Sequence, residues 1–253
     1  MDGHELLVVI PAYNEEKTIA RVLELLKREG VFEFADILVV DDGSLDATGQ
    51  IAKDSRCLLV SHVFNLGYGS ALQTGYKYAL RNGYQYVIQM DADGQHDPCN
   101  IPVIYSSLRE PDEAGRLPDM VLGSRFMEGS VDFPVSAAKK MAFLLFRFMI
   151  RLATGERIAD PTTGLQGLNR RAFSCYAAYG RFDERYPDAN MIMQMLLLHY
   201  RIRQIPAVMH ARQDGQSMHA GLKPVWYMLR MFFCVLAVVF RIRVLRLDKE
   251  VQA

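Results

Sequence analysis

The sequence predicts an α/β fold in which a mainly parallel central sheet is flanked by helices. Short apolar runs rich in Val, Ile and Leu alternate with segments of helical periodicity through the first half of the chain. Each run is too short for a helix and is bounded by polar or turn residues, which is typical of buried strands. Strands that alternate with helices form parallel sheets, because each crossover places a helix on a face of the sheet. With 253 residues, of which 50% are hydrophobic, the chain suits one domain or at most two.

Five strands and two helices are predicted in order along the first half. The strands are expected at Leu6–Ile10, Ile37–Val40, Cys57–Val60, Tyr86–Met90 and Met120–Leu122. After the first strand, an apolar stripe at helical spacing predicts an amphipathic helix; its members are Ile19, Val22, Leu23 and Leu26. A similar stripe predicts a helix before the fourth strand; its members are Leu72, Tyr76, Ala79 and Leu80.

The second half of the chain changes character and predicts fewer strands. Helices are expected over Lys139–Ala153 and Asp188–Tyr200, with a loop over Asp160–Gly167 and a strand over Ile202–Met209. A long helix that is both basic and apolar is expected at the C-terminus, over residues 221–253.

The charge distribution indicates the kind of partner, and the cysteine content indicates the cellular compartment. Lys plus Arg and Asp plus Glu both number 29, so the net charge indicates no nucleic-acid partner. Two segments are nonetheless basic, Lys139–Arg157 and Lys223–Arg246, which indicates local contact with an anion. The four cysteines have no metal-binding spacing, and reduced thiols favour a cytoplasmic protein. The longest apolar run, Met231–Phe240, is about half of what a membrane crossing needs, so no spanning helix is expected.

Polar side chains follow the predicted strands at the edge where ligands bind in parallel α/β sheets, beyond the carboxyl ends. The segments at this edge are Pro11–Glu16, Asp41–Ser44, Asn65–Gly69, Asp91–Gln95 and Gly123–Arg125. Asp91 and Asp93 are the most specific indication of a ligand site, since two carboxylates at i and i+2 repel each other unless a cation lies between them. Hard oxygen ligands suit Mg²⁺ or Mn²⁺, which shares its shell readily with a diphosphate. The alternative is a pair of solvated loop acids next to an Asp-Gly turn.

Other features at the same edge have two interpretations each. Asp41 and Asp42 could face a ligand, while Ser44 could simply cap a helix. Glu15 could reflect the preference of acids for helix N-termini, whereas Tyr13 could stack on a base. The loop from Asn65 to Ser70 is rich in glycine but matches neither of the standard phosphate-binding loops.

Five motifs in order resemble the family 2 glycosyltransferases with the nucleotide-diphospho-sugar (GT-A) fold, and in particular the polyprenyl-phosphate branch of the dolichol-phosphate mannose synthase type. The motifs are VVIPAYNEE, LVVDDGS, NLGYGSALQTG, QMDADGQH and GSRF, within residues 6–126. Looser similarity continues through DPTTGLQGLN, YPD and ARQDGQS. The resemblance implies a GT-A catalytic domain over residues 1–220, with a nucleotide-sugar and metal half (1–126) and an acceptor half (127–220).

The resemblance also implies an inverting transfer of one sugar from a nucleotide diphosphate sugar, with Mg²⁺ or Mn²⁺ as cofactor. Carried over by position, the nucleotide-sugar contacts would be Pro11, Tyr13, Glu15, Asp42 and Asp91. Asp91, Asp93 and Gln95 would hold the metal and the diphosphate, while Arg125, Lys139 and Arg212 would bind the acceptor phosphate. Asp93, Arg125 and Asp188 are therefore the expected catalytic residues.

The acceptor defines two alternatives. A polyprenyl phosphate is already ionised and requires no protein base, whereas a glycan hydroxyl in polysaccharide assembly requires a carboxylate. Asp188 is the first candidate for that base and Asp160 the second. A catalytically silent relative recruited to a membrane is a third possibility. The sequence departs from the family at Met218-His219, where a lysine often stands, and lacks the C-terminal spans of some relatives.

The two basic segments predict amphipathic helices at the membrane surface. Lys140, Arg147 and Arg151 share one face of a helix whose other positions are mostly apolar. Trp226 and Tyr227 in the C-terminal helix suit the depth of lipid headgroups. We therefore expect a peripheral enzyme at the inner face of the cell membrane. A homo-oligomer or a small membrane subunit would account for the same apolar surface.

Overall fold

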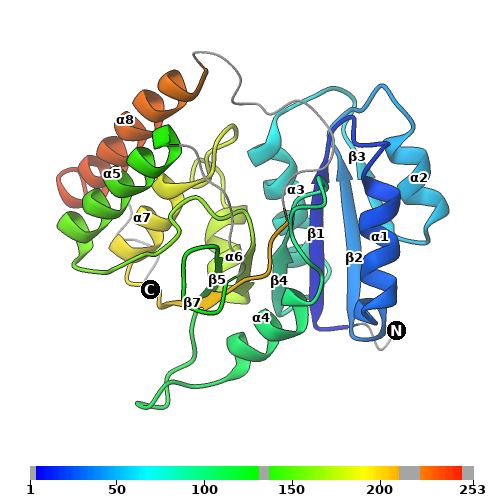
Figure 1. Cartoon of the computed structure of the whole chain (residues 1–253), viewed down its shortest axis with the longest axis horizontal. Helices are drawn as coiled ribbons and strands as arrows, with labels where there is room; N and C mark the ends of the chain where they lie inside the picture. The colour runs from blue at the N-terminus through cyan, green and yellow to red at the C-terminus, as the bar shows by residue number, and fades with distance from the viewer. Residues whose placement is uncertain (1–3, 131–136, 211–222, 247–253) are drawn as a thin grey trace.

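A computed structural model describes residues 4–130, 137–210 and 223–246, and Figure 1 shows its layers. Seven strands form one sheet in the order β3-β2-β1-β4-β6-β5-β7. Their bounds are β1 Leu6–Ala12, β2 Ala35–Asp41, β3 Leu58–Ser61, β4 Tyr86–Gln89, β5 Met120–Ser124, β6 Gln166–Asn169 and β7 Ile202–Pro206. The strands β3, β2, β1 and β4 are parallel neighbours, and β5 pairs in parallel with β7. The mainly parallel sheet that the sequence predicts is therefore present.

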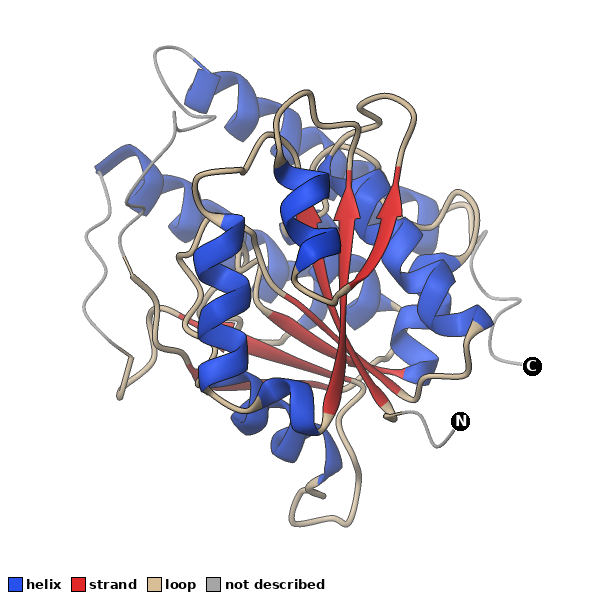
Figure 2. Cartoon of the chain, turned by 90° about the vertical axis from the view of Figure 1, so that its right-hand side faces the viewer, coloured by secondary structure: helices blue, strands red, loops and turns tan. Residues whose placement is uncertain are grey.

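Helices cover both faces of this sheet (Figure 2). They are α1 Ile19–Arg28, α2 Thr48–Asp54, α3 Tyr68–Arg81, α4 Asn100–Arg109, α5 Ala137–Thr154, α6 Arg170–Ala177, α7 Ala189–Leu197 and α8 Lys223–Arg243, with a short 3-10 turn at Val31–Glu33. One apolar core contains residues of α3, α5, α6, α7 and α8, and a second contains residues of α1 and α4 on the other face. Both predicted apolar stripes are buried in these cores, apart from Leu80, which is exposed.

Strand β6 is the main element that the sequence analysis missed, because it was assigned to a loop as far as Gly167. It runs antiparallel between β4 and β5, so that Gly167 lies opposite both Ile88 and Val121. Its sequence, QGLN, has neither apolar alternation nor β-branched residues. A Cβ on Gly167 would lie 2.3 Å from Ile104 Cγ2, so close packing of α4 on the sheet requires a glycine here.

Two further differences concern burial and helix content. The strand predicted at Cys57–Val60 is an edge strand rather than a buried one, and Leu58 in β3 is 36% exposed. Helices α2, α4 and α6 had no predicted counterpart. The predicted strand over Ile202–Met209 is β7, which ends at Pro206, and the helix expected over Asp188–Tyr200 is α7.

Helices α5 and α8 lie side by side at one end of the molecule, where α8 also packs on α7 (Figure 1). Within the described part of the chain, neither these nor any other helix has the length and apolar character of a membrane span.

Candidate active site

The loops after β1 and β2 are joined by hydrogen bonds at the carboxyl edge of the sheet. The side-chain oxygen of Asn14 accepts from the backbone N–H of Leu45 at 2.9 Å, and the backbone N–H of Asn14 donates to Ser44 Oγ at 3.0 Å. Pro11 is buried at the end of β1, whereas Tyr13 is 43% exposed. Glu15 accepts from Thr18 Oγ1 at 2.7 Å. Pro11, Tyr13 and Glu15, which are expected to contact the nucleotide, thus stand at and directly after the end of β1.

Asp42 holds the loop that follows β3. Its carboxylate accepts from the backbone N–H groups of Leu66 and Gly67 at 2.9 and 2.8 Å, and His62 Nδ1 lies 2.6 Å from Oδ1. The residue is 2% exposed. Such a buried carboxylate must be compensated by donors, and here those donors come from the loop. In this structure, then, Asp42 is turned toward the loop backbone, whereas the sequence assigned it a contact with the nucleoside.

The same loop is held from its other side by the segment that precedes α7. Ser70 donates its backbone N–H to the carbonyl oxygen of Glu184 at 3.1 Å. A Cβ built on Gly69 would lie 2.0 Å from the carbonyl oxygen of Asp183, so only glycine permits this approach. The glycines of this loop therefore serve close backbone packing.

Replacing Gly69 with Ala is expected to destabilise the protein, although alanine normally stabilises a helix by about 1 kcal/mol relative to glycine. Gly69 lies in α3, but the added methyl group would overlap the Asp183 carbonyl and force the two segments apart. Thermal unfolding should therefore show a lower midpoint for Gly69→Ala. Ser70→Ala at the next position is the control and should change the midpoint little; equal midpoints for the two variants would contradict this packing argument.

Tyr68 is a site residue that the sequence analysis did not assign. Its hydroxyl donates to Asp91 Oδ1 at 2.7 Å. Burial, together with the charge of Asp91, raises the pKa of Tyr68 well above its ordinary value, so the phenol remains a proton donor. The sequence contains no signal for this contact, because it depends on how Asp42 and Glu184 hold the loop.

His96 contacts Asp91 through both of its ring nitrogens. Its Nδ1 accepts from the backbone N–H of Asp91 at 3.0 Å, and its Nε2 lies 3.7 Å from Asp91 Oδ2. Burial lowers the pKa of His96 to about 4, so the ring is neutral near pH 7. With Nδ1 accepting, the ring proton belongs on Nε2 and faces the carboxylate. His96 thus orients Asp91.

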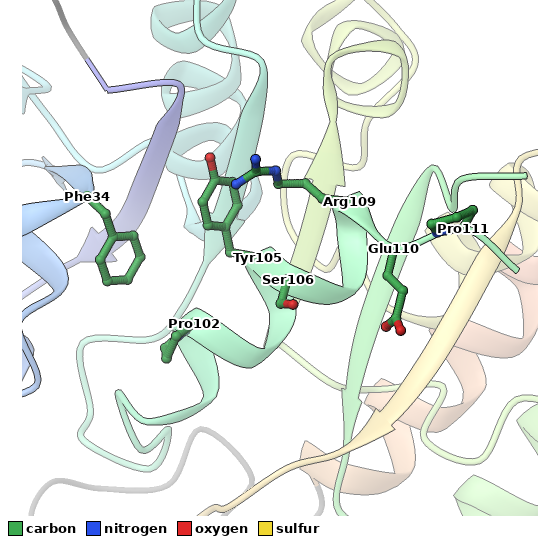
Figure 3. Close-up of a pocket in the computed structure, with 7 residues that line it drawn as sticks. All are labelled: Phe34, Pro102, Tyr105, Ser106, Arg109, Glu110 and Pro111. Carbon is green, nitrogen blue, oxygen red and sulfur yellow. The ribbon is translucent and has the colours of Figure 1, made fainter.

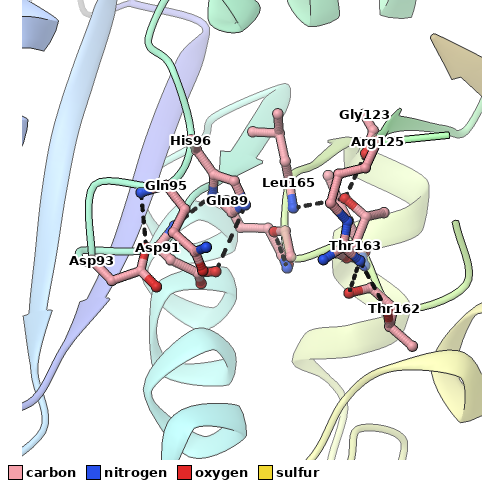
Figure 4. A network of polar contacts seen from close by, with 12 residues as sticks. Gln89, Asp91, Asp93, Gln95, His96, Gly123, Arg125, Thr162, Thr163 and Leu165 are labelled. Atoms are coloured by element: carbon pink, nitrogen blue, oxygen red, sulfur yellow. Dashed lines mark hydrogen bonds and ion pairs between the residues drawn. The ribbon is translucent and has the colours of Figure 1, made fainter. Parts of the chain in front are cut away.

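Asp91, Asp93 and Gln95 lie on one short loop after β4 (Figure 4). Asp93 Oδ1 accepts from the backbone N–H of Gln95 at 3.0 Å, and the Gln95 amide nitrogen lies 3.5 Å from the carbonyl oxygen of His210. The side chain of Asp91 is 29% exposed. Two carboxylates and one amide are hard oxygen donors, which fit Mg²⁺ or Mn²⁺. Within the described residues, no three His, Cys, Asp or Glu side chains are grouped to hold a metal ion.

Arg125 follows β5 and forms a bidentate ion pair with Asp160. Nε and Nη2 of Arg125 each lie 2.7 Å from a carboxylate oxygen of Asp160. Nη2 also donates to Thr162 Oγ1 at 3.0 Å (Figure 4). Burial acts to lower the pKa of Arg125, but the hydrogen bonds and charge of Asp160 outweigh it and raise this pKa above the ordinary value. Because the side chain of Asp160 is fully buried and holds Arg125, the structure corrects its assignment as a second candidate base.

Asp188 lies at the N-terminal end of α7 and is half-buried. Burial and the nearer carboxylates have the larger effects on the pKa values of Tyr68 and Arg125, and the charge of Asp188 also raises both values. Asp188 therefore belongs to the same electrostatic environment as Asp91. Of the residues expected to bind the acceptor phosphate, Arg212 and the side chain of Lys139 lie outside the described residues. The structure therefore brings Asp91, Arg125 and Asp188 together from three separate elements.

A surface pocket lies away from this edge of the sheet. The pocket in Figure 3, about 610 Å³ in volume, is lined by α4 and by Phe34, which directly precedes β2. The start of β2 is the opposite end of the strand from Asp41. The pocket therefore contributes nothing to the site described above.

Sequence comparison connects this geometry to known proteins. The family model described as glycosyl transferase family 2 matches residues 7–177. The uncharacterized protein MJ1222 of Methanocaldococcus jannaschii is 37% identical over 69% of this chain and 66% of its own length. The undecaprenyl-phosphate mannosyltransferase of Micrococcus luteus is 30% identical over 85% of this chain and 88% of its own.

Solved structures share the fold at lower identity. A glucosyl-3-phosphoglycerate synthase from Mycobacterium tuberculosis, in complex with Mn²⁺, UDP-glucose and phosphoglyceric acid, matches with a TM-score of 0.67 and 20% identity, covering 94% of this chain and 80% of that one. The family match spans the strands and loops that carry Asp42, Asp91, Asp93 and Arg125. The chain belongs to glycosyl transferase family 2 and has the GT-A fold that its motifs predict.

Proposed function

We propose that this glycosyltransferase moves a sugar from a nucleotide diphosphate sugar to a polyprenyl phosphate at the cytoplasmic face of the membrane. The observation that carries the proposal is the convergence of an oxygen-rich loop, Asp91–Gln95, with an oriented arginine, Arg125, at one edge of the sheet. The first is suited to the donor diphosphate and the second to an acceptor phosphate. Relatives named undecaprenyl-phosphate mannosyltransferase and polyprenol monophosphomannose synthase support a lipid phosphate as acceptor.

The proposed role of each site residue follows from the contacts of its side chain. Asp91, Asp93 and Gln95 would hold a divalent cation, which neutralises charge on the departing nucleoside diphosphate. Tyr68 and His96 hold Asp91 in place, so that its carboxylate is oriented before the donor binds. Arg125 is held by Asp160, which fixes the direction of its planar guanidinium at the acceptor side. The acceptor phosphate is already ionised, so no side chain has to remove a proton from it.

A membrane-facing surface supports the lipid acceptor. Exposed apolar side chains line α5 and the C-terminal part of α8, which pack against each other. We call this surface the apolar face; its members are Met141, Leu144, Phe148 and Leu152 of α5 with Leu229, Phe233, Leu236, Phe240, Val244 and Leu245 in and directly after α8. Each is at least 43% exposed. Soluble monomers rarely expose so many contiguous apolar side chains, so this surface is suited to the bilayer that holds the acceptor.

Product formation is the direct test of this proposal. The protein is incubated with Mn²⁺ or Mg²⁺, undecaprenyl phosphate and a panel of nucleotide sugars in detergent, and the lipid fraction is analysed for a glycolipid. Arg125→Ala should then reduce turnover strongly, whereas Asp188→Asn should leave most of it. If glycan acceptors react and the lipid phosphate does not, and if Asp188→Asn abolishes turnover, the transfer is to a hydroxyl group and the proposal is wrong.

Tyr68→Phe is expected to weaken binding of the metal and donor without loss of the fold. The phenol is the donor that holds Asp91 Oδ1, and removal of such outer contacts typically weakens a metal about 10-fold. Mn²⁺ titration in the presence of UDP, followed by electron paramagnetic resonance, measures this directly. Tyr78→Phe serves as a control in the same helix, because Tyr78 lies outside the loop that contacts Asp91. Unchanged Mn²⁺ affinity in Tyr68→Phe would show that the Tyr68 hydroxyl does not support the metal site and that the side chain serves only in packing.

A further inference from the structure

An open cavity, distinct from the pocket in Figure 3, lies at the opposite end of the sheet from the candidate active site. It has a volume of about 1070 Å³ and lies between the C-terminal ends of α5, α7 and α8 and the starts of β5 and β7. Leu117 and Pro118, which precede β5, line it, whereas Arg125 follows the other end of that strand. A five-residue strand is roughly 17 Å long. The cavity, which we call the basic groove, is therefore separate from the site of sugar transfer.

Most of the charged side chains that line the basic groove are arginines. Six line it: Arg116, Arg157, Arg201, Arg203, Arg243 and Arg246. Two acids, Asp112 and Glu156, line it as well, and Asp112 pairs with Arg116 at 3.0 Å. The positive charge of the lining thus exceeds its negative charge, which favours an anionic ligand.

The contacts of these arginines leave much of their charge uncancelled. Arg201 Nε donates to the carbonyl oxygen of Leu117 at 2.7 Å, Arg203 donates to that of Ser107 at 3.0 Å, and Arg243 donates to that of Ala153. A carbonyl group orients a guanidinium but carries no net charge. Arg203 also lies 3.8 Å from Glu110, a carboxylate that is largely exposed and therefore screened by water. Backbone carbonyls from several elements thus hold cations at the groove.

The basic groove is continuous with the apolar face. Val244 and Leu245, which are 62% and 51% exposed, stand in the chain between the groove residues Arg243 and Arg246. Leu152, which is 75% exposed, lies two residues before Thr154, a groove residue at the end of α5. Exposed apolar side chains beside arginines are typical of surfaces that insert into the headgroup region of an anionic bilayer.

We propose that the basic groove binds the phosphate groups of anionic phospholipids while the apolar face of α5 and α8 rests on the same leaflet. This inference rests on the membrane-facing surface of the proposed function and adds a lipid class to it. Binding at the groove would orient the protein, because the groove and the candidate active site lie toward opposite ends of the sheet. The carboxyl edge would then be held at a fixed angle to the membrane that contains the acceptor.

Vesicle co-sedimentation of the full chain tests this assignment at low and at moderate salt. The vesicles contain phosphatidylcholine alone or with phosphatidylglycerol at roughly one lipid in three, a fraction that gives an anionic surface. The test variant, Arg157→Gln with Arg246→Gln, removes two exposed groove cations. The control, Lys27→Gln with Arg28→Gln, removes two exposed cations from α1, which lies at the far end of the molecule in Figure 1.

The groove variant should bind the anionic vesicles about 30-fold more weakly than the unmodified chain, because each arginine near such a surface contributes about 1 kcal/mol. The control variant should bind as the unmodified chain does, and binding to neutral vesicles should be the same for all three. Formation of glycolipid in detergent should also be the same for all three, so failure of the sugar-transfer proposal is measured separately.

Three results would overturn the assignment. The unmodified chain could bind anionic and neutral vesicles equally; the control variant could lose as much binding as the groove variant; or millimolar inorganic phosphate could remove the preference for phosphatidylglycerol at matched ionic strength. The last result would identify a site for a soluble phosphate compound rather than for a lipid surface.

Discussion

Asp93→Ala is expected to lower the rate of sugar transfer by about 1000-fold or more at saturating donor. A cation bound at a leaving diphosphate supplies several kcal/mol of charge stabilisation, and about 4 kcal/mol corresponds to a factor of 1000. The fold should survive, because Asp93 is half-exposed on the loop after β4 and holds the backbone N–H of Gln95. The measurement is turnover with Mn²⁺ and the preferred donor, beside the midpoint of thermal unfolding.

Ligand-induced stabilisation makes this test independent of turnover. A ligand that binds only the folded state raises the unfolding midpoint by mass action. The nucleoside diphosphate of the preferred donor, together with Mn²⁺, should therefore raise the midpoint of the unmodified chain and not that of Asp93→Ala. Asp112→Ala is the matched control, because Asp112 lies in an exposed loop of the basic groove. If Asp93→Ala keeps full activity, the assignment of the metal to the Asp91–Gln95 loop is wrong.

The strands of the first half could be predicted from sequence because they are short apolar runs. Leu6–Ile10 and Ile37–Val40 lie wholly within β1 and β2, where every residue of β1 is buried. The prediction failed where tertiary contacts determine the structure. β6 has no strand-like pattern, and it forms because the edges of β4 and β5 both pair with it.

Sequence motifs indicate which residues stand at the candidate site, but they do not indicate which of these residues contact one another. The acids and the arginine at the strand ends could be recognised from motifs, since each motif is local in sequence. The contact of Tyr68 with Asp91 spans 23 residues and that of Arg125 with Asp160 spans 35. Such pairs depend on how loops from different strands meet, and a single sequence carries no direct record of that. Asp42 illustrates the difference: its motif suggests a ligand contact, while its hydrogen bonds hold a loop.

Asp160→Ala is expected to cost about 3 kcal/mol of unfolding free energy. Removal of one partner from a buried ion pair leaves the other charge uncompensated, which typically costs 3–5 kcal/mol. The side chain of Asp160 is fully buried, but that of Arg125 is 17% exposed, so partial hydration places the cost at the lower end of this range. For a chain of this size, about 3 kcal/mol corresponds to a fall of roughly 10 °C in the unfolding midpoint. Thermal and denaturant unfolding both measure it.

Two comparisons separate the buried charge from a simple loss of packing. Arg116→Ala breaks the exposed pair with Asp112 but keeps the backbone hydrogen bonds that this carboxylate accepts. It should leave the unfolding midpoint almost unchanged, because water screens that pair. The double variant Arg125→Met with Asp160→Leu should be more stable than Asp160→Leu alone, since it removes the orphaned guanidinium together with its partner. The double variant could instead lose as much unfolding free energy as Arg125→Met and Asp160→Leu lose together. The ion pair would then not be what holds the end of β5 in place. Arg125 would then be oriented by its contacts with Phe126, Phe143 and Thr162.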